Sequence, residues 1–166
     1  MPKPAPEITV RRATPADAEA LGRLGAVLVA VHHQYDPDRF IAPTAATERG
    51  YAGFLKGELA RDDAVILVAE DRDGVLGYVY AALEGMDWMS LRGPAGAIYD
   101  IVVDPDRRGA GVGRRLLDEV LAALAALGAP QVVLSTAYPN EGARRLFAAA
   151  GFRPTMIEMT RPGGGG

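Results

Sequence analysis

Glycines and arginines gather in one short stretch of this chain and indicate a site for a phosphate-bearing ligand. The stretch reads Arg108-Gly-Ala-Gly-Val-Gly113, and it follows a β-branched run that ends at Asp104-Pro105. An alanine- and leucine-rich run that favours a helix begins directly after it, so the glycines lie where a helix exposes its free N–H groups. Because glycine has no Cβ, the backbone can approach an anion closely. The segment therefore predicts a cradle for a diphosphate.

The spacing of the glycines separates the kinds of phosphate-binding loop. A P-loop ends in Gly-Lys-Ser/Thr, whereas Arg114 and Arg115 follow the last glycine here. A dinucleotide fingerprint needs a third glycine at the position that Leu116 occupies. The pattern that fits is Arg-x-x-Gly-x-Gly. A nucleotide-binding module that uses the same glycines differently stays open as an alternative.

A second motif lies further along the chain, from Asn140 to Phe152. It runs Asn140-Glu-Gly-Ala-Arg-Arg-Leu-Phe-Ala-Ala-Ala-Gly151-Phe152. We expect Asn140 to cap a short helix and Gly151 to end it in a left-handed conformation. Ala143 and Leu146 would face the sheet.

Together, these two motifs resemble the acetyl-CoA pyrophosphate loop and the closing Asn-x-x-Ala-x-x-Leu-Tyr-x-x-x-Gly-Phe signature of the GCN5-related N-acetyltransferase (GNAT) superfamily. The resemblance covers residues 64–160 well, and residues 8–63 match only as strand, helix and helix. It implies an α/β fold in a single domain. The central sheet would be mixed, mostly antiparallel and with a splayed strand pair, and helices would flank both of its faces.

The resemblance also implies acetyl-CoA as co-substrate, without a metal. The thiol arm would lie between the strand that ends at residue 103 and the strand that ends at residue 136, with the Val103 N–H polarising the thioester carbonyl. The pyrophosphate would rest on the N–H groups of residues 108–113, and Asn140 would flank the cofactor arm. The implied cofactor-binding residues are Ile101, Val102, Val103, Arg108, Gly109, Ala110, Gly111, Val112, Gly113, Arg114 and Asn140.

Several residues are candidates for the base that deprotonates an acceptor amine. The chain has no cysteine, so transfer through a cysteinyl intermediate is excluded and the acetyl group must pass directly to the amine. Strand alternation puts Tyr99 on the face where the family often carries its base, but tyrosine is a poor base near neutral pH. Asp100 would reach that face only through a bulge, and otherwise it would bond nearby backbone. Glu70 and Glu84 stay open as alternatives.

Phe147 departs from the family pattern, in which a tyrosine often stands to protonate the departing thiolate. Tyr138 and Tyr99 are the candidate substitutes. Alternatively, the thiolate leaves unprotonated, because a thiol pKa near 8.5 makes it a tolerable leaving group. Phe147 also lends weight to another hypothesis, a non-catalytic acyl-CoA-binding or sensor domain on the same fold.

We expect His33, Tyr35, Trp88 and Tyr99 to contact the acceptor. For the histidine, a solvated position at a helix end is an equally good interpretation. The acceptor would be a primary amine of a small molecule or of a peptide or protein N-terminus, which the sequence does not name.

Length and composition limit the other possibilities. The chain has 166 residues and a net charge of −3, which fits one globular domain and argues against nucleic-acid binding. No apolar run is long enough to cross a bilayer, so no membrane partner and a cytoplasmic location are expected. A homodimer is compatible with the sequence. We expect a disordered arm over residues 1–6, the domain over 7–161 and a flexible glycine tail over 162–166.

Hydrophobic periodicity and capping residues predict the order β-α-α-β-β-β-α-β-α-β. The predicted strands span residues 8–12, 64–71, 75–83, 97–103, 132–136 and 152–159. The predicted helices span residues 14–31, 44–61, 112–127 and 140–150.

Overall fold

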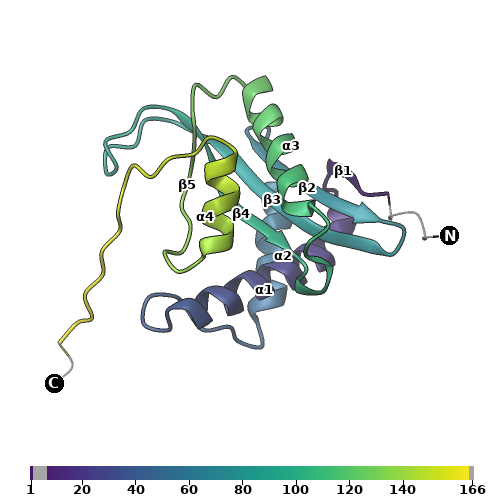
Figure 1. Ribbon diagram of the computed structural model, residues 1–166, viewed down its shortest axis with the longest axis horizontal. Helices are drawn as coiled ribbons and strands as arrows, with labels where there is room; N and C mark the ends of the chain where they lie inside the picture. Colours follow the sequence, from purple (N-terminus) through teal and green to yellow (C-terminus); the bar gives the residue numbers. More distant parts are fainter. Residues whose placement is uncertain (2–6, 165–166) are drawn as a thin grey trace.

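A single sheet with two helices on each side forms the body of the computed structural model, which describes residue 1 and residues 7–164 (Figure 1). The strands are β1 (Thr9–Arg12), β2 (Ala64–Asp71), β3 (Gly74–Glu84), β4 (Ala95–Val103) and β5 (Val132–Leu134). The helices are α1 (Ala18–Tyr35), α2 (Thr47–Glu58), α3 (Val112–Ala126) and α4 (Glu141–Ala149), with 3-10 turns at Pro15–Asp17 and Pro105–Arg107.

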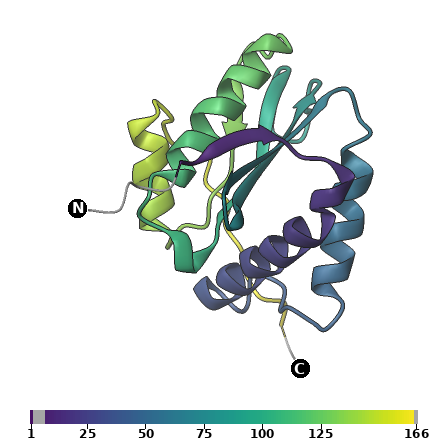
Figure 2. The same cartoon turned by 90° about the vertical axis from the view of Figure 1, so that its right-hand side faces the viewer.

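The strands lie in the order β1-β2-β3-β4-β5. The first four pair antiparallel, and β5 pairs parallel with β4. Helices α3 and α4 cover one face of the sheet and α1 and α2 the other (Figure 2). The predicted fold class, a mixed and mostly antiparallel sheet between helices, is confirmed.

Each face of the sheet has its own hydrophobic core. On one face, the apolar stripe of α3, including Leu116, Leu117 and Val120, packs on alternate residues of β2, β3 and β4. On the other face, Leu21 and Leu24 of α1 and Leu55 of α2 are fully buried. The stripes follow the 3.6-residue period that the sequence predicts for these helices.

Two glycines of α1 allow α2 to approach closely. A Cβ on Gly22 would lie 2.5 Å from the Glu48 carbonyl oxygen, and a Cβ on Gly25 would lie 2.2 Å from the Tyr51 ring. Both contacts are shorter than atoms tolerate, so only glycine fits. The close approach fixes the ring of Tyr51 beneath the sheet.

A β-bulge interrupts the pairing of β3 with β4. Tyr80 pairs with Asp100 and Ala81 pairs with Ile98, so Tyr99 is the extra residue. A bulge shifts the alternation of the strand by one residue. Asp100 consequently faces α1 and α2, on the side of Tyr78 and Tyr80. The bulge that this carboxylate needs in order to reach the face expected for the base is therefore present.

The splayed strand pair is also present, and it opens earlier than expected. β4 and β5 share three pairs, which end at Ile98 with Leu134. The strand predicted over residues 132–136 therefore stops two residues short. From residue 99 to residue 103, β4 runs on without β5 beside it.

The predicted last strand, residues 152–159, is wrong. After α4 the chain continues as an extended segment that leaves the body of the fold (Figure 1), with Met156, Ile157 and Met159 largely exposed. Alternating apolar residues supply strand propensity, but a strand also needs a partner edge, and Pro154 has no N–H to donate. The predicted helix boundaries also shift, because α1 continues through His32 and His33 to Tyr35 and α2 begins at Thr47.

The expectations for the chain ends fall largely outside the described residues. Residues 2–6 of the predicted arm and residues 165–166 of the predicted tail are not described. Within the described part of the chain, no helix combines the length and the apolar character that a membrane crossing requires.

The packing of α1 on α2 gives a test of stability. We expect Gly25→Ala to lower the free energy of unfolding by about 1–3 kcal/mol, because the new methyl group collides with the Tyr51 ring. Gly53→Ala on α2 is the matched control, since nothing lies within 4 Å of its Cβ. It should be neutral or stabilise by up to about 1 kcal/mol. Denaturant unfolding measures both, and equal effects would contradict the close approach.

Candidate functional site

A groove of about 720 Å³ follows the open end of β4. Its walls come from β4, the loop before α3, the start of α4 and one side of α1. Ten of the eleven predicted cofactor residues line it, and Ala110 does not. The ten are Ile101, Val102, Val103, Arg108, Gly109, Gly111, Val112, Gly113, Arg114 and Asn140.

The predicted cradle lies at the start of α3. Gly109 and Gly111 have φ values of 87° and 74°, and nothing stands within 4 Å of a Cβ on either residue. Gly111 is the N-cap of α3, and no described side chain caps the helix there. Exposed N–H groups and the positive end of the helix dipole favour an anion at this position. The cradle therefore fits a pyrophosphate.

Two arginines of this region are paired with carboxylates, and one of these two also lines the groove. Arg107 pairs with Asp71, and Arg114 donates to Asp118 one turn further along α3 at 2.9 Å. Both guanidinium groups are thus partly neutralised by the protein. Arg108 and Arg114 line the groove, so their charge is the basic contribution nearest to a bound polyanion.

The splay of β4 from β5 supplies the second part of a cofactor site. Because β5 ends at Leu134, residues Ile101 to Val103 have no strand of the sheet on that side. Their backbone can hydrogen-bond an extended ligand as a strand would. Asn140 lies across the groove, where its side chain accepts from the Ala143 N–H at 3.1 Å and caps α4 as predicted.

Asp100 is a buried carboxylate at the wall of this groove. Only 8% of its surface is exposed. It accepts hydrogen bonds from the Tyr51 hydroxyl at 2.7 Å and the Tyr78 hydroxyl at 2.9 Å. Burial raises the pKa of Asp100 above its ordinary value, and the two hydroxyls and the nearby His32 oppose part of that rise. A carboxylate with a raised pKa is a stronger base than an exposed one.

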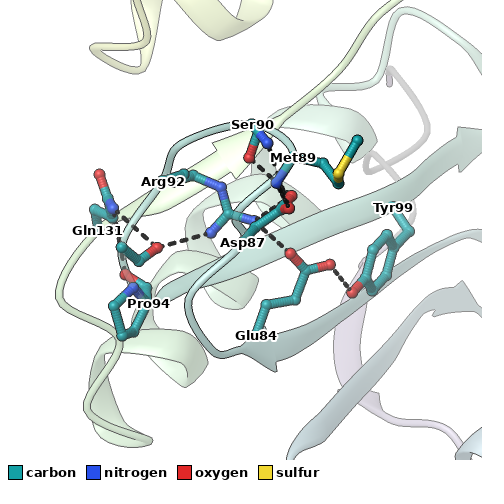
Figure 3. A network of polar contacts seen from close by, with 9 residues as sticks. Glu84, Asp87, Met89, Ser90, Arg92, Pro94, Tyr99 and Gln131 are labelled. Atoms are coloured by element: carbon teal, nitrogen blue, oxygen red, sulfur yellow. Dashed lines mark hydrogen bonds and ion pairs between the residues drawn. The ribbon is translucent and has the colours of Figure 1, made fainter.

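Tyr99 lies beside Asp100 with 44% of its surface exposed. Its hydroxyl donates to Glu84, which Arg92 holds from the other side (Figure 3). Burial and the Glu84 hydrogen bond raise the pKa of Tyr99 to about 12. This phenol is consequently a weak proton donor, and its ring is fixed by the Glu84–Arg92 pair.

Only some of the other residues predicted from the sequence line the groove. Tyr35 lines the groove, and so does His32 in place of the predicted His33, whose Nδ1 lies 2.9 Å from the Phe40 carbonyl oxygen. Trp88 is 76% exposed in the loop between β3 and β4, and Tyr138 is 81% exposed. Neither of these two rings lines the groove.

Phe147 and the alternative base Glu70 both make contacts that stabilise the fold. Phe147 is buried in the groove wall against Phe152. Glu70 accepts from Arg11, which also holds Asp17, on the β1 side of the sheet. Among the residues that the structure describes, no three side chains of the metal-binding types are grouped to hold an ion.

Sequence reasoning missed Tyr51, Tyr78 and His32 as partners of Asp100. The pattern Tyr78-Val-Tyr80 on one strand did signal two rings on one face. Nothing in the sequence signalled that Tyr51 of α2 would reach the same carboxylate, because that contact depends on how α2 packs against the sheet.

Comparison with known proteins gives the family. The sequence profile of the acetyltransferase (GNAT) family matches residues 28–152, and this chain belongs to that family. A mycothiol acetyltransferase of Clavibacter michiganensis is 35% identical over 98 residues, which cover 59% of this chain and 30% of that protein. The chain thus spans less than a third of that relative. An uncharacterised N-acetyltransferase of Bacillus subtilis is 27% identical over 147 residues, covering 87% and 89% of the two chains.

Solved structures show the same fold. A mutant protein from Bacillus halodurans superposes with a TM-score of 0.78 at 22% identity, covering 93% of this chain and 98% of that one. A predicted acetyltransferase from Clostridium acetobutylicum, solved with acetyl-CoA, has a TM-score of 0.72 at 17% identity and covers 93% and 96%.

The cradle can be tested by a pair of glycine substitutions. Gly111→Ala and Gly128→Ala both put a side chain at positive φ, 74° and 85°, where nothing lies within 4 Å. Each should cost about 1–2 kcal/mol of stability. Only Gly111 lines the groove, so only Gly111→Ala should weaken acetyl-CoA binding, by about tenfold or more, because its Cβ enters the space of the phosphate. Calorimetric titration of the folded variants measures their acetyl-CoA affinities. Equal affinities in the two variants would contradict acetyl-CoA binding at this loop.

Proposed function

We propose that this chain is an acetyl-CoA-dependent N-acetyltransferase that transfers the acetyl group directly to a primary amine, with Asp100 as the base. The observation that carries the proposal is the position of a buried carboxylate in the wall of the groove, next to the open end of β4. Perturbed carboxylates in clefts are candidates for catalysis. The bound co-substrate would supply the acetyl thioester.

Different residues of the groove would have different roles in the transfer. Backbone of Ile101 to Val103 would hold the thiol arm, and the Val103 N–H would polarise the thioester carbonyl. The amine nitrogen forms the new C–N bond as the C–S bond breaks, and the amine proton passes to the Asp100 carboxylate. Holding both reactants in line supplies part of the rate enhancement.

Neither of the two tyrosines predicted as the acid, Tyr99 and Tyr138, is well suited to protonate the thiolate. The pKa of Tyr99, raised to about 12 by burial and Glu84, lies well above the thiol value near 8.5. Tyr138 is exposed outside the groove. The expectation that follows is departure of an unprotonated thiolate, with Phe147 as a packing residue. Tyr99 is then an acceptor contact, together with the predicted Tyr35.

Acetyl-CoA titration followed by thiol release over a panel of amines tests the function as a whole. With no cysteine in the chain, both substrates must be bound before transfer, so initial-rate plots should intersect. Parallel lines with an isolable acetyl-enzyme would contradict direct transfer. Acetyl-CoA binding without turnover of any amine would favour the alternative, a non-catalytic acyl-CoA sensor. The homodimer remains a prediction, which sedimentation would test.

Replacing the base gives a sharper prediction. Asp100→Asn should lower kcat by about 10²–10⁴-fold, the usual contribution of a general base. Acetyl-CoA affinity should stay unchanged, because the amide keeps the shape of the side chain. Single-turnover rates and calorimetry separate the two effects. Full kcat in a folded Asp100→Asn variant would eliminate this base.

The tyrosine hydrogen bonds predict a pH effect with a defined sign. The Tyr51 hydroxyl lowers the pKa of Asp100, so Tyr51→Phe should raise that pKa. The base is active when deprotonated, and therefore the rise of kcat/KM with pH should move to higher pH. Tyr80→Phe is the control, since its hydroxyl donates to Glu58 and not to Asp100. The same acceptor amine is used for every variant, so its own titration affects all the pH profiles equally. Identical pH profiles of kcat/KM for Tyr51→Phe and Tyr80→Phe would contradict the assignment of Asp100 as the base.

A further inference from the structure

A second, smaller pocket lies between α2 and the sheet. It has a volume of about 320 Å³ and is lined by Tyr51, Phe54, Tyr80, Tyr99 and Asp100, and we call it the aromatic pocket. Tyr99 and Asp100 also line the groove. The candidate base therefore stands where the two spaces meet. A ligand in the aromatic pocket would contact Asp100 without entering the cradle, because none of residues 108–113 lines this pocket.

The four rings form a continuous chain around this pocket. Ring centroids are 6.5 Å apart for Tyr51 and Phe54, 6.0 Å for Phe54 and Tyr80, and 5.0 Å for Tyr80 and Tyr99. The first two pairs meet at angles near perpendicular, 80° and 77°. Aromatic faces carry negative partial charge, so such walls attract a cation and also accept hydrocarbon.

The three tyrosine hydroxyls of the pocket all donate to carboxylates. Tyr51 donates to Asp100 at 2.7 Å, Tyr80 donates to Glu58 at 2.5 Å, and Tyr99 donates to Glu84. Each hydroxyl has a single proton to give. These side chains consequently offer no donor to a carboxylate, a phosphate or a sugar oxygen inside the pocket.

The carboxylates behind the rings leave a net negative charge on both sides. Arg61 is shared between Glu58 and Asp63. In the same way, Arg92 is shared between Glu84 and Asp87, at the base of the loop between β3 and β4 (Figure 3). Each group has two carboxylates for one guanidinium. The field of both groups thus favours a cation in the space between them.

From these observations we propose that the aromatic pocket is the acceptor subsite and that it selects a small alkylammonium. The hydrocarbon chain lies against the faces of Phe54, Tyr80 and Tyr99, and the cationic nitrogen lies at Asp100. The bound ammonium loses one proton to solvent before it attacks, and the second proton passes to Asp100 during the transfer. The inference deepens the proposed acetyl transfer and rests on it. The expected acceptor is then an aliphatic amine without an acidic group. Amino acids and polyhydroxylated amino sugars are disfavoured.

Binding without acetyl-CoA tests the pocket independently of catalysis. Three probes of similar length are titrated by calorimetry: butylamine, butan-1-ol and 4-aminobutanoate. Butylamine should bind at least about tenfold more tightly than the other two, since only it combines a cation with a purely apolar chain. Chemical-shift changes should concentrate on the four rings. Equal affinities for butylamine and butan-1-ol, or shifts confined to the groove, would overturn the proposal.

Phe54→Leu separates cation recognition from simple apolar burial. Phe54 is 54% exposed on α2, so its replacement should leave the fold intact. Leucine keeps an apolar wall but removes the aromatic face. Butylamine affinity should fall severalfold while butan-1-ol affinity changes little. Gly53→Ala is the control for changes to α2. If Phe54→Leu lowers the affinities for butylamine and butan-1-ol equally, the pocket recognises only apolar surface and not the cation.

Turnover then distinguishes failure of this inference from failure of the proposed function. If amino acids or amino sugars are acetylated as well as butylamine is, the transferase activity stands and the selectivity inference is wrong. If butylamine binds at the four rings but acetyl-CoA acetylates no amine, the ammonium subsite stands and the proposed transfer is wrong.

Discussion

The buried carboxylate of Asp100 is the interaction on which the rest of the site depends. An ionisable group removed from water must be hydrogen-bonded or it destabilises the fold. Here Tyr51 and Tyr78 meet that requirement from two different elements, α2 and β3. Tyr51 reaches the carboxylate because Gly25 leaves room for its ring between the helices. The helix packing, the bulge in β4 and the ionisation of one side chain are thus parts of a single arrangement.

The bulge and the early end of β5 act together on β4. The extra residue at Tyr99 turns Asp100 toward α1 and α2, while the loss of pairing beyond Leu134 frees the edge of the same strand that faces β5. One strand consequently presents free backbone at one edge and a carboxylate with aromatic neighbours on one face. A site for two substrates needs this division, because each must reach the same point from its own direction.

The parts of the structure that the sequence predicts are those that short-range rules govern. The glycine loop, the Asn140 cap and the Gly151 stop all depend on a few consecutive residues, and the structure has each of them. Contacts across the fold were not predictable in the same way. His32 and His33 are adjacent, and the rotation of α1 alone decides which one faces the groove. The expected strand at residues 152–159 had the local pattern but found no partner among the described strands.

The position of Asp100 also distinguishes an enzyme from a module that only binds acyl-CoA. A binding module needs the cradle and the open strand, and neither of these requires a carboxylate at position 100. A carboxylate would weaken such a module, because its charge is unfavourable in a buried position, as the raised pKa of Asp100 reflects, and because that charge repels an anionic ligand. Phe147 argues less strongly in the other direction, since a thiolate can leave without a proton donor. A base that is costly to bury, set between a groove for one substrate and an aromatic pocket for another, is better explained by proton abstraction than by binding.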